Sequence, residues 1–273
     1  MIKAKDTTKI KESVKKVKKK QVKKNEFGIN IEEMAKAGVN FGHRISIRHP
    51  KMKPYLTGTK STVHIINLEK TVEKLEQALK FIQEIASEGK SILLVGTKIQ
   101  HRELIKELAH ANNLPYIVER WLGGTFTNFE VIRKRNEYFK DLERKQKEGE
   151  LEKYTKKENI RLNRELVKLR TKFEGTRDMN ELPGAILVID ARKDAIAVKE
   201  ARMKNIKVIA LVDTNIDPTL IDYPIPANDD AISSVKYILD KVDLAFKTKK
   251  SKSKEEEKKE EKKEEKKEEK KEA

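Results

Sequence analysis

Two aspartates at the ends of predicted strands are the residues best placed to do chemistry. Asp190 ends the apolar run AILVID (185–190), and Asp213 ends KVIALVD (207–213). At the carboxyl edge of a parallel sheet, such carboxylates could bind Mg²⁺ or a ribose, as in an α/β enzyme that acts on a phosphorylated substrate. The other interpretation, which we favour, is that both cap the turns and helix starts that follow. We therefore predict no cofactor, and leave open only a structural Mg²⁺ at these two residues.

Glycine turns and histidines give little further support to an enzyme. VGTK (95–98) and LGGT (122–125) offer too few backbone amides to cradle a phosphate, and the sequence contains neither G-x-G-x-x-G nor G-x-x-x-x-G-K-[ST]. The histidines lack the spacing of a metal site or a triad, and we interpret each as solvated or facing RNA. They are His43, His49, His64, His101 and His110. No catalytic residue is predicted.

The segment at 41–60, FGHRISIRHPKMKPYLTGTK, has the composition of a nucleic-acid contact. Positive charges alternate there with flat rings and turn residues, which suits phosphates and unstacked bases. A solvated basic loop is an equally good interpretation of the charge alone. The residues of this segment that we predict to bind RNA are Phe41, His43, Arg44, Arg48, Lys51, Lys53, Tyr55 and Lys60.

The charge of the chain is concentrated at its two ends. The formal net charge is +17, and charged residues (39%) outnumber hydrophobic ones (37%). Residues 1–26 carry eleven Lys against three acids, residues 247–273 carry thirteen Lys against ten Glu, and every Arg lies between them. We expect a Lys-rich disordered extension at 1–26 and a disordered Lys/Glu low-complexity tail at 247–273. The body would then form defined contacts with a phosphate-bearing partner through Arg, and the tails would supply diffuse positive charge through Lys.

The remaining composition excludes several protein classes. The sequence has no Cys, which excludes disulfides, thiolate metal sites and cysteine nucleophiles. No apolar run approaches the roughly 20 residues of a membrane span, and no hydrophobic segment at the N-terminus suits a secretory signal. We expect a cytoplasmic protein.

From residue 63 onward, predicted strands alternate with amphipathic helices. The strands are VHIINL (63–68), SILLVGT (91–97), PYIVE (115–119), AILVID (185–190), KVIALVD (207–213) and YPIPAN (223–228). This alternation predicts a Rossmann-like, doubly wound parallel sheet covered on both faces. A last helix would bury Ile232, Val235, Leu239 and Val242 and be capped by Asp229 or Asp230.

The pattern changes between the third and fourth of these strands. Apolar residues form one narrow stripe before Gly149 and another after it, and a Thr155–Glu158 capping box begins the second stripe. We predict an inserted antiparallel helical hairpin, a coiled coil, at 129–175 that projects from an α/β body at 27–128 and 176–246.

The loop RWLGGTFTN (120–128) joins the body to this hairpin. We predict that Trp121, Gly123, Gly124 and Thr125 anchor the hairpin, with Trp121 as an apolar plug and Thr125 or Thr127 capping the helix. The residues near it that we predict to reach RNA are Arg120, Asn128, Arg133 and Lys134.

Seven ordered segments resemble one known family. They are GVNFGHRISIRHPKMKPYL, VHIINLEKT, LLVGTK, RWLGGTFTN, LPGAILVIDA, ALVDTN and IPANDDAI, within about 31–247. They closely resemble the bacterial and organellar ribosomal protein S-two (S2) family. The resemblance implies a Rossmann-like body with a protruding helical hairpin, and no enzymatic activity. It also implies binding to small-subunit rRNA between head and body on the solvent side, and docking of the mRNA-binding protein S-one.

One short segment departs from the family pattern. Members usually carry an aromatic residue and then Asn before Pro-Lys-Met-Lys-Pro, whereas this sequence has Arg48 and His49. A stacking contact at that point is therefore not predicted. The two charged tails also lie outside the resemblance.

Overall fold

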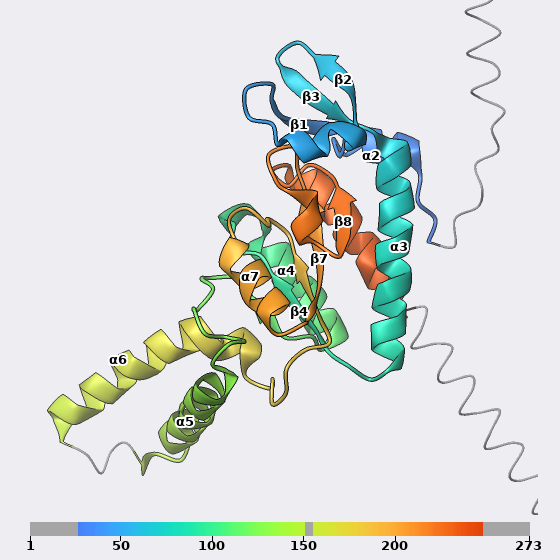
Figure 1. Cartoon of the computed structure of the whole chain (residues 1–273). Coiled ribbons are helices and arrows are strands. Elements are labelled where there is room, and N and C mark those ends of the chain that lie inside the picture. The colour runs from blue at the N-terminus through green and yellow to red at the C-terminus, as the bar shows by residue number, and fades with distance from the viewer. Residues whose placement is uncertain (1–26, 151–154, 248–273) are drawn as a thin grey trace, which may run out of the picture.

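The computed structural model describes residues 27–150 and 155–247 (Figure 1). The predicted extension at 1–26 and nearly all of the predicted tail at 247–273 lie outside the described residues. The helices are α2 (Ile31–Lys36), α3 (Leu68–Ser87), α4 (Arg102–Asn112), α5 (Phe129–Lys147), α6 (Lys156–Phe173), α7 (Ala195–Met203) and a C-terminal helix at 232–247. Short 3-10 helices are η1 (Pro50–Tyr55), η2 (Ile99–His101), η4 (Glu174–Thr176) and η5 (Pro218–Leu220).

A five-stranded parallel sheet forms the centre of this mixed α/β fold, as the doubly wound prediction requires. Its strands stand in the order β5-β4-β6-β7-β8. The chain passes from β4 to β5 on one side and then crosses to β6 on the other side, so that the strand order reverses beside β4. The strands are β4 (Ile92–Val95), β5 (Tyr116–Ile117), β6 (Ala185–Val188), β7 (Lys207–Val212) and β8 (Tyr223–Pro226).

Two buried clusters cover the two faces of this sheet. Successive residues of a strand point to opposite faces, so that Leu187 joins one cluster and Ile186 and Val188 join the other. On the first, which we call the α3 face, α3, α4 and the C-terminal helix pack against the strands. On the second, the α7 face, α7 packs together with loops and the short helix η1. The sheet is buried on both faces, but the α7 face has fewer helices.

The first predicted strand belongs to another sheet. Residues 63–66 form β3 (Val63–Ile66), which lies between β1 (Phe41–Arg44) and β2 (Leu56–Lys60) in a three-stranded antiparallel sheet. The prediction that this strand joins the parallel sheet is therefore wrong. Burial alternates along β3, with His64 and Ile66 buried and their neighbours only partly so, as in a sheet with one solvated face. An apolar run predicts a strand but does not identify its partners.

The predicted insertion forms two helices that return along each other and extend away from the body (Figure 1). Hydrogen bonds join Asn136 to Thr176, Glu143 to Arg170 and Gln146 to Asn163, a register in which α5 and α6 run in opposite directions. The two helices share a separate buried cluster of Phe139, Leu142, Leu166, Leu169 and Phe173. The predicted Thr155–Glu158 capping box is present at the start of α6. Supercoiling of this pair stays a prediction.

One carboxylate organises the loop that leads into α5. Trp121 is buried and packs edge-on against Phe126, with ring centroids 5.0 Å apart. Glu200 of α7 accepts hydrogen bonds from the Trp121 indole (3.2 Å) and from the backbone of Gly124 (2.8 Å), Phe126 (3.0 Å) and Thr127 (3.2 Å). Burial opposes ionisation of Glu200, but these donors prevail and lower its pKa. The loop is thus fastened to α7 by one charge.

Several predicted helix caps differ in the structure. Thr125 donates to the Leu122 carbonyl and Thr127 donates to Glu200, so that neither caps α5, which follows Asn128. Before the C-terminal helix, the side chain of Asn228 accepts from the backbone of Asp230 and Ala231, in place of a cap by Asp229 or Asp230. Val235, Leu239 and Val242 of the predicted apolar face are buried, but Ile232 is exposed. Ile238, which was not predicted, packs in the core on this helix.

Both edges of the parallel sheet are poor partners for another strand. At one edge β5 has only two residues, and Gly175 lies so close that an added Cβ would be 2.2 Å from the Tyr116 carbonyl oxygen. At the other edge, the backbone N–H of Ala227 donates to Val212 of β7. Because alternate residues of a strand direct their N–H groups to the same side, those of positions 224 and 226 in β8 would face outward. Both are proline and have no N–H. The sheet therefore offers few free donors at either side.

Glu200→Ala tests the anchor of the loop. The change leaves four N–H groups without their acceptor, at a cost of roughly 1–3 kcal/mol for each one that stays buried. We expect the free energy of unfolding to fall by at least ~3 kcal/mol, and the fluorescence of Trp121, the single Trp, to shift towards that of a solvated indole. Urea denaturation followed by this fluorescence measures both.

Glu73→Ala is the matched control, because the side chain of Glu73 is exposed on α3 and has no hydrogen bond or ion pair to a described residue. Equal effects of the two substitutions would show that Glu200 does not hold the loop.

Candidate functional site

The carboxyl edge of the parallel sheet is where a doubly wound fold usually binds a ligand, at the point where the strand order reverses. Here that point lies between β4 and β6. Thr97 follows β4, and its backbone N–H and hydroxyl both donate to Asp194, at 3.2 and 2.9 Å. Lys98 lies 3.5 Å from Asp190, which follows β6. Contacts within the chain thus engage these side chains, although a pocket of about 360 Å³ lined by His43, Lys98 and Asp190 stays open at this edge.

Asp190 has the capping role that we favoured from the sequence. One of its oxygens accepts from the backbone N–H of Arg192 (3.0 Å) and of Lys193 (2.9 Å), in the turn that leads to α7. Asp213 also accepts from the next residue, the backbone N–H of Thr214. Neither carboxylate is held free for a substrate.

Lys98 neutralises several carboxylates at this edge. Besides Asp190, its Nζ lies 3.5 Å from Asp229 and forms a shorter ion pair with Asp230. Lys98 is only partly exposed and Asp229 is buried. Burial, together with the charges of Asp190 and Asp213, raises the pKa of Asp229 to about 7. One lysine does not fully balance the acidic groups around it.

His43 is part of this edge and is not simply solvated. Its Nδ1 lies 2.9 Å from Asp213 and its Nε2 lies 3.6 Å from Asp230. The hydrogen bond with Asp213 raises the pKa of His43 against the effect of partial burial. Donor atoms of these three residues lie within 4.8 Å of one another, close enough to hold a metal ion. Asp213 is therefore placed with His43 and Asp230, whereas Asp190 is held by Lys98.

His101 was likewise misjudged as solvated. Its side chain is fully buried, and its Nε2 lies 2.9 Å from the carbonyl oxygen of Asp229. Burial lowers its pKa, which keeps the imidazole neutral. Sequence reasoning missed this packing because His101 precedes α4 and shows no helical periodicity with its neighbours.

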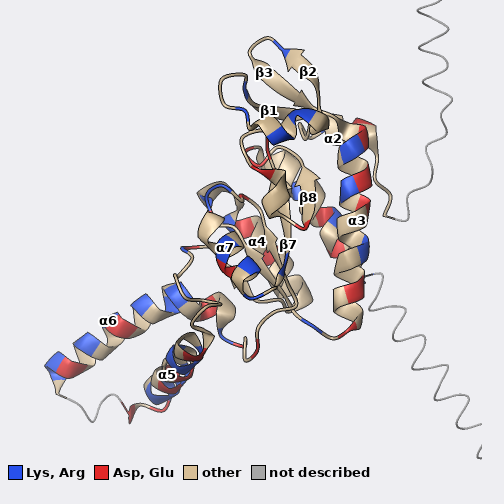
Figure 2. Ribbon diagram, in the orientation of Figure 1, with Lys and Arg blue, Asp and Glu red and all other residues tan. Residues whose placement is uncertain are grey.

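The basic segment at 41–60 lies on and beside the small sheet, where Figure 2 shows several of its Lys and Arg. Four of its predicted RNA-binding cations are exposed and form no ion pair with any described residue: Arg44, Arg48, Lys53 and Lys60. Phe41, Ile45 and Ile47 are exposed among them, at 44%, 49% and 43%. The surface therefore combines unpaired positive charge with apolar side chains.

Besides His43, two predicted members of that segment are engaged with the body. Lys51 donates to Asp217 at 2.8 Å and to Thr219 at 2.9 Å. The Lys51 contact lowers the pKa of Asp217 well below its ordinary value. Tyr55 is partly buried against the α7 face, and its carbonyl accepts from Asn67. Both side chains help to fix η1 to the body.

The predicted RNA-binding residues near the loop are all exposed. Arg120 and Lys134 form no ion pair with a described residue, whereas Arg133 lies 3.5 Å from Glu137 in the next turn of α5. Asn128 precedes α5 and makes no side-chain capping bond. These residues lie in the loop before α5 and in its first turns, and in Figure 1 helix α5 lies far from the small sheet. The structure thus separates the predicted contacts into two surfaces.

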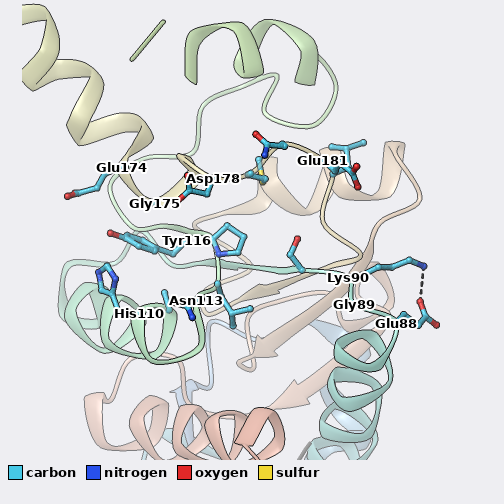
Figure 3. Close-up of a pocket in the computed structure, with 17 residues that line it drawn as sticks. Glu88, Gly89, Lys90, His110, Asn113, Tyr116, Glu174, Gly175, Asp178 and Glu181 are labelled. Carbon is cyan, nitrogen blue, oxygen red and sulfur yellow. Dashed lines mark ion pairs between the residues drawn. The ribbon is translucent and has the colours of Figure 1, made fainter. Parts of the chain in front are cut away.

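A pocket of about 720 Å³ opens at the opposite, amino edge of the parallel sheet (Figure 3). Its labelled residues come from the ends of α3 and α4 with the turns after them, from Tyr116 of β5, and from the segment from Glu174 to Glu181. Lys90 pairs there with Glu88 at 2.8 Å. None of the predicted site residues lines this pocket. It also lies away from the edge at which doubly wound enzymes bind substrates.

The pKa of Asp229 predicts a dependence of stability on pH. In the unfolded chain this group has its ordinary pKa near 3.8, whereas in the folded chain it is about 7. Between these values the folded state binds the extra proton, so the free energy of unfolding falls as pH rises. Asp229→Asn removes this term, and the stability of the variant relative to wild type should increase by about 3–4 kcal/mol from pH 4 to pH 7.

Urea denaturation at several pH values measures the effect, with Asp240→Asn, an exposed position on the C-terminal helix, as control. A difference between variant and wild type that did not change with pH would show that Asp229 is ionised in the folded protein.

In the described residues, no helix is both long and apolar enough to cross a membrane. The model of the family described as Ribosomal protein S2 matches residues 34–249. This match spans both sheets and the inserted helices, and it covers most of the 273 residues. Members of this family are structural proteins of the small ribosomal subunit. The chain therefore belongs to the ribosomal protein S2 family.

Proposed function

We propose that this structural protein of the small subunit binds rRNA through the surface formed by β1, η1 and the turns beside them. The observation that carries the proposal is the group of unpaired cations Arg44, Arg48, Lys53 and Lys60. A cation already paired within the protein gains little from a phosphate, whereas an unpaired one releases condensed counterions from RNA when it binds. These four side chains are therefore available for backbone contacts.

The apolar residues of the same surface support RNA over simple solvation. Phe41 offers an exposed ring on which an unpaired base could stack, and Ile45 and Ile47 extend the apolar area. Exposed aliphatic side chains between arginines have no role in a solvated basic loop. Tyr55 and Lys51 would act indirectly, because their contacts with the body hold η1 in place.

Arg120, Asn128, Arg133 and Lys134 would form a second contact at the base of the α5–α6 pair. Their distance from the small sheet suits an RNA that passes over both parts of the protein. The body would then position the chain on rRNA, and cytoplasmic ribosomes would be its location.

The alternative of an enzyme at Asp190 and Asp213 is the weaker one, because the pocket at this edge is lined by groups that already bond within the protein. Asp190 caps a turn and contacts Lys98, and Asp213 contacts His43. A structural cation stays a proposal, now at His43, Asp213 and Asp230. A set of one imidazole and two carboxylates suits Zn²⁺ better than Mg²⁺. Calorimetric titration that detected neither ion would contradict it.

Docking of the mRNA-binding protein S-one is also proposed, on the resemblance to the S-two family alone. Small subunits that lacked the chain should then lose S-one and regain it when the purified chain is added back. Subunits that kept S-one without the chain would contradict this proposal.

Arg44→Ala with Arg48→Ala tests the RNA surface. Each lost phosphate contact should reduce the slope of log affinity against log salt by about 1, so that the pair reduces it by about 2. We expect affinity for a small-subunit rRNA transcript to fall roughly tenfold or more at low salt. Filter binding at several salt concentrations measures both quantities.

Lys80→Ala with Lys236→Ala is the control, because it removes the same charge from exposed, unpaired positions on two helices. If both pairs weakened binding equally, positive charge in general, and not this surface, would be responsible.

A further inference from the structure

An apolar groove of about 290 Å³ lies beside α7, and the Lys51–Asp217 pair that joins η1 to the start of η5 stands at one end of its lining. Its floor contains the buried side chains of Val198, Ile216 and Ile221. At its sides Met203 and Leu220 are 72% and 46% exposed. Seven of its ten lining residues are apolar, so the groove is an unusual feature on a chain with so much charge.

The groove lies where the fold lacks a helix. Crossovers between parallel strands usually contain an α-helix that covers one face of the sheet. The connection from β6 to β7 contains α7, but the connection from β7 to β8 contains only η5, which is three residues long. The groove runs between these two elements and is lined by one face of α7, from Ala195 to Met203. A second helix beside α7 would complete the α7 face.

Two cations at the edge of the groove favour a negatively charged ligand. Lys199 and Arg202 both line the groove from α7, are exposed and have no ion pair with a described residue. The acid at the other side, Asp217, is already engaged by Lys51 and Thr219. The rim is therefore positive and the floor apolar, which suits carboxylates flanking aliphatic anchors.

The floor argues against RNA as the occupant. Binding of unpaired bases relies on rings for stacking and on donors and acceptors for base edges, and the lining contains no aromatic side chain. A helix that buries two or three apolar side chains in a groove and keeps a polar outer face needs neither.

We propose that this groove receives an amphipathic helix of another small-subunit protein, with aliphatic anchors on one face and Asp or Glu beside them. The helix packs next to α7, and its carboxylates pair with Lys199 and Arg202. This inference goes beyond RNA binding by the small sheet and requires only that the chain is assembled into the subunit.

Single thiols in assembled subunits test the proposal. Because the chain has no cysteine, Met203→Cys and Leu220→Cys each introduce one thiol of this protein at the groove. In the free chain both should react with a maleimide as fast as Lys80→Cys, an exposed control on α3. In small subunits the two groove thiols should react at least tenfold more slowly. Lys199→Glu with Arg202→Glu should remove this protection, whereas Arg202→Lys should keep it.

A benzophenone maleimide attached at Met203→Cys identifies the molecule that occupies the groove. Photolysis followed by mass spectrometry should find the cross-link on an amphipathic segment of another protein that carries Asp or Glu beside aliphatic residues. Cross-links to rRNA, to a second copy of this chain or to a basic segment would each overturn the proposal. Groove thiols that stayed as reactive in subunits as in the free chain would overturn it as well.

Discussion

The side chain of Glu200 connects the main parts of this protein. It belongs to α7, which covers one face of the parallel sheet, and it accepts the N–H groups of the loop that leads into α5. Because the donors are backbone and indole groups, their positions are fixed once the carboxylate is buried. The direction in which the α5–α6 pair leaves the body thus depends on a residue of a different layer. The same short helix carries the groove on its outer side.

At the carboxyl edge of the sheet, side chains that could bind a ligand are bonded to one another. At the reversal of strand order, Thr97 is bound to Asp194 and Lys98 is surrounded by Asp190, Asp229 and Asp230. A nucleotide enzyme would keep amides or a lysine free at this position. Here they are used within the protein, and the surfaces open to partners lie on the small sheet and beside α7. Sharing this fold with enzymes therefore does not by itself imply their function.

Local patterns predicted the elements well and their long-range contacts poorly. Apolar periodicity identified α3 and α6, and the capping box of α6 was visible in four residues of sequence. The sheet to which β3 belongs was not predictable, because pairing with β1 and β2 is a property of the tertiary fold. Glu200 looks like an ordinary helical surface residue, since the groups it binds lie more than seventy residues earlier in the chain. The unpaired state of Arg44 and Arg48 also required coordinates, although their charge was evident.

The two edges of the parallel sheet, which offer few free N–H donors, matter for the protein before it is assembled into a ribosome. A newly made chain that is not yet assembled into a subunit can meet other copies, and an open strand edge would let sheets join one another into aggregates. Prolines in β8 remove the donors at one side, and the close approach of Gly175 to Tyr116 covers the other. Its fold thus protects the free chain through backbone chemistry alone, and leaves its side chains to serve the assembled particle.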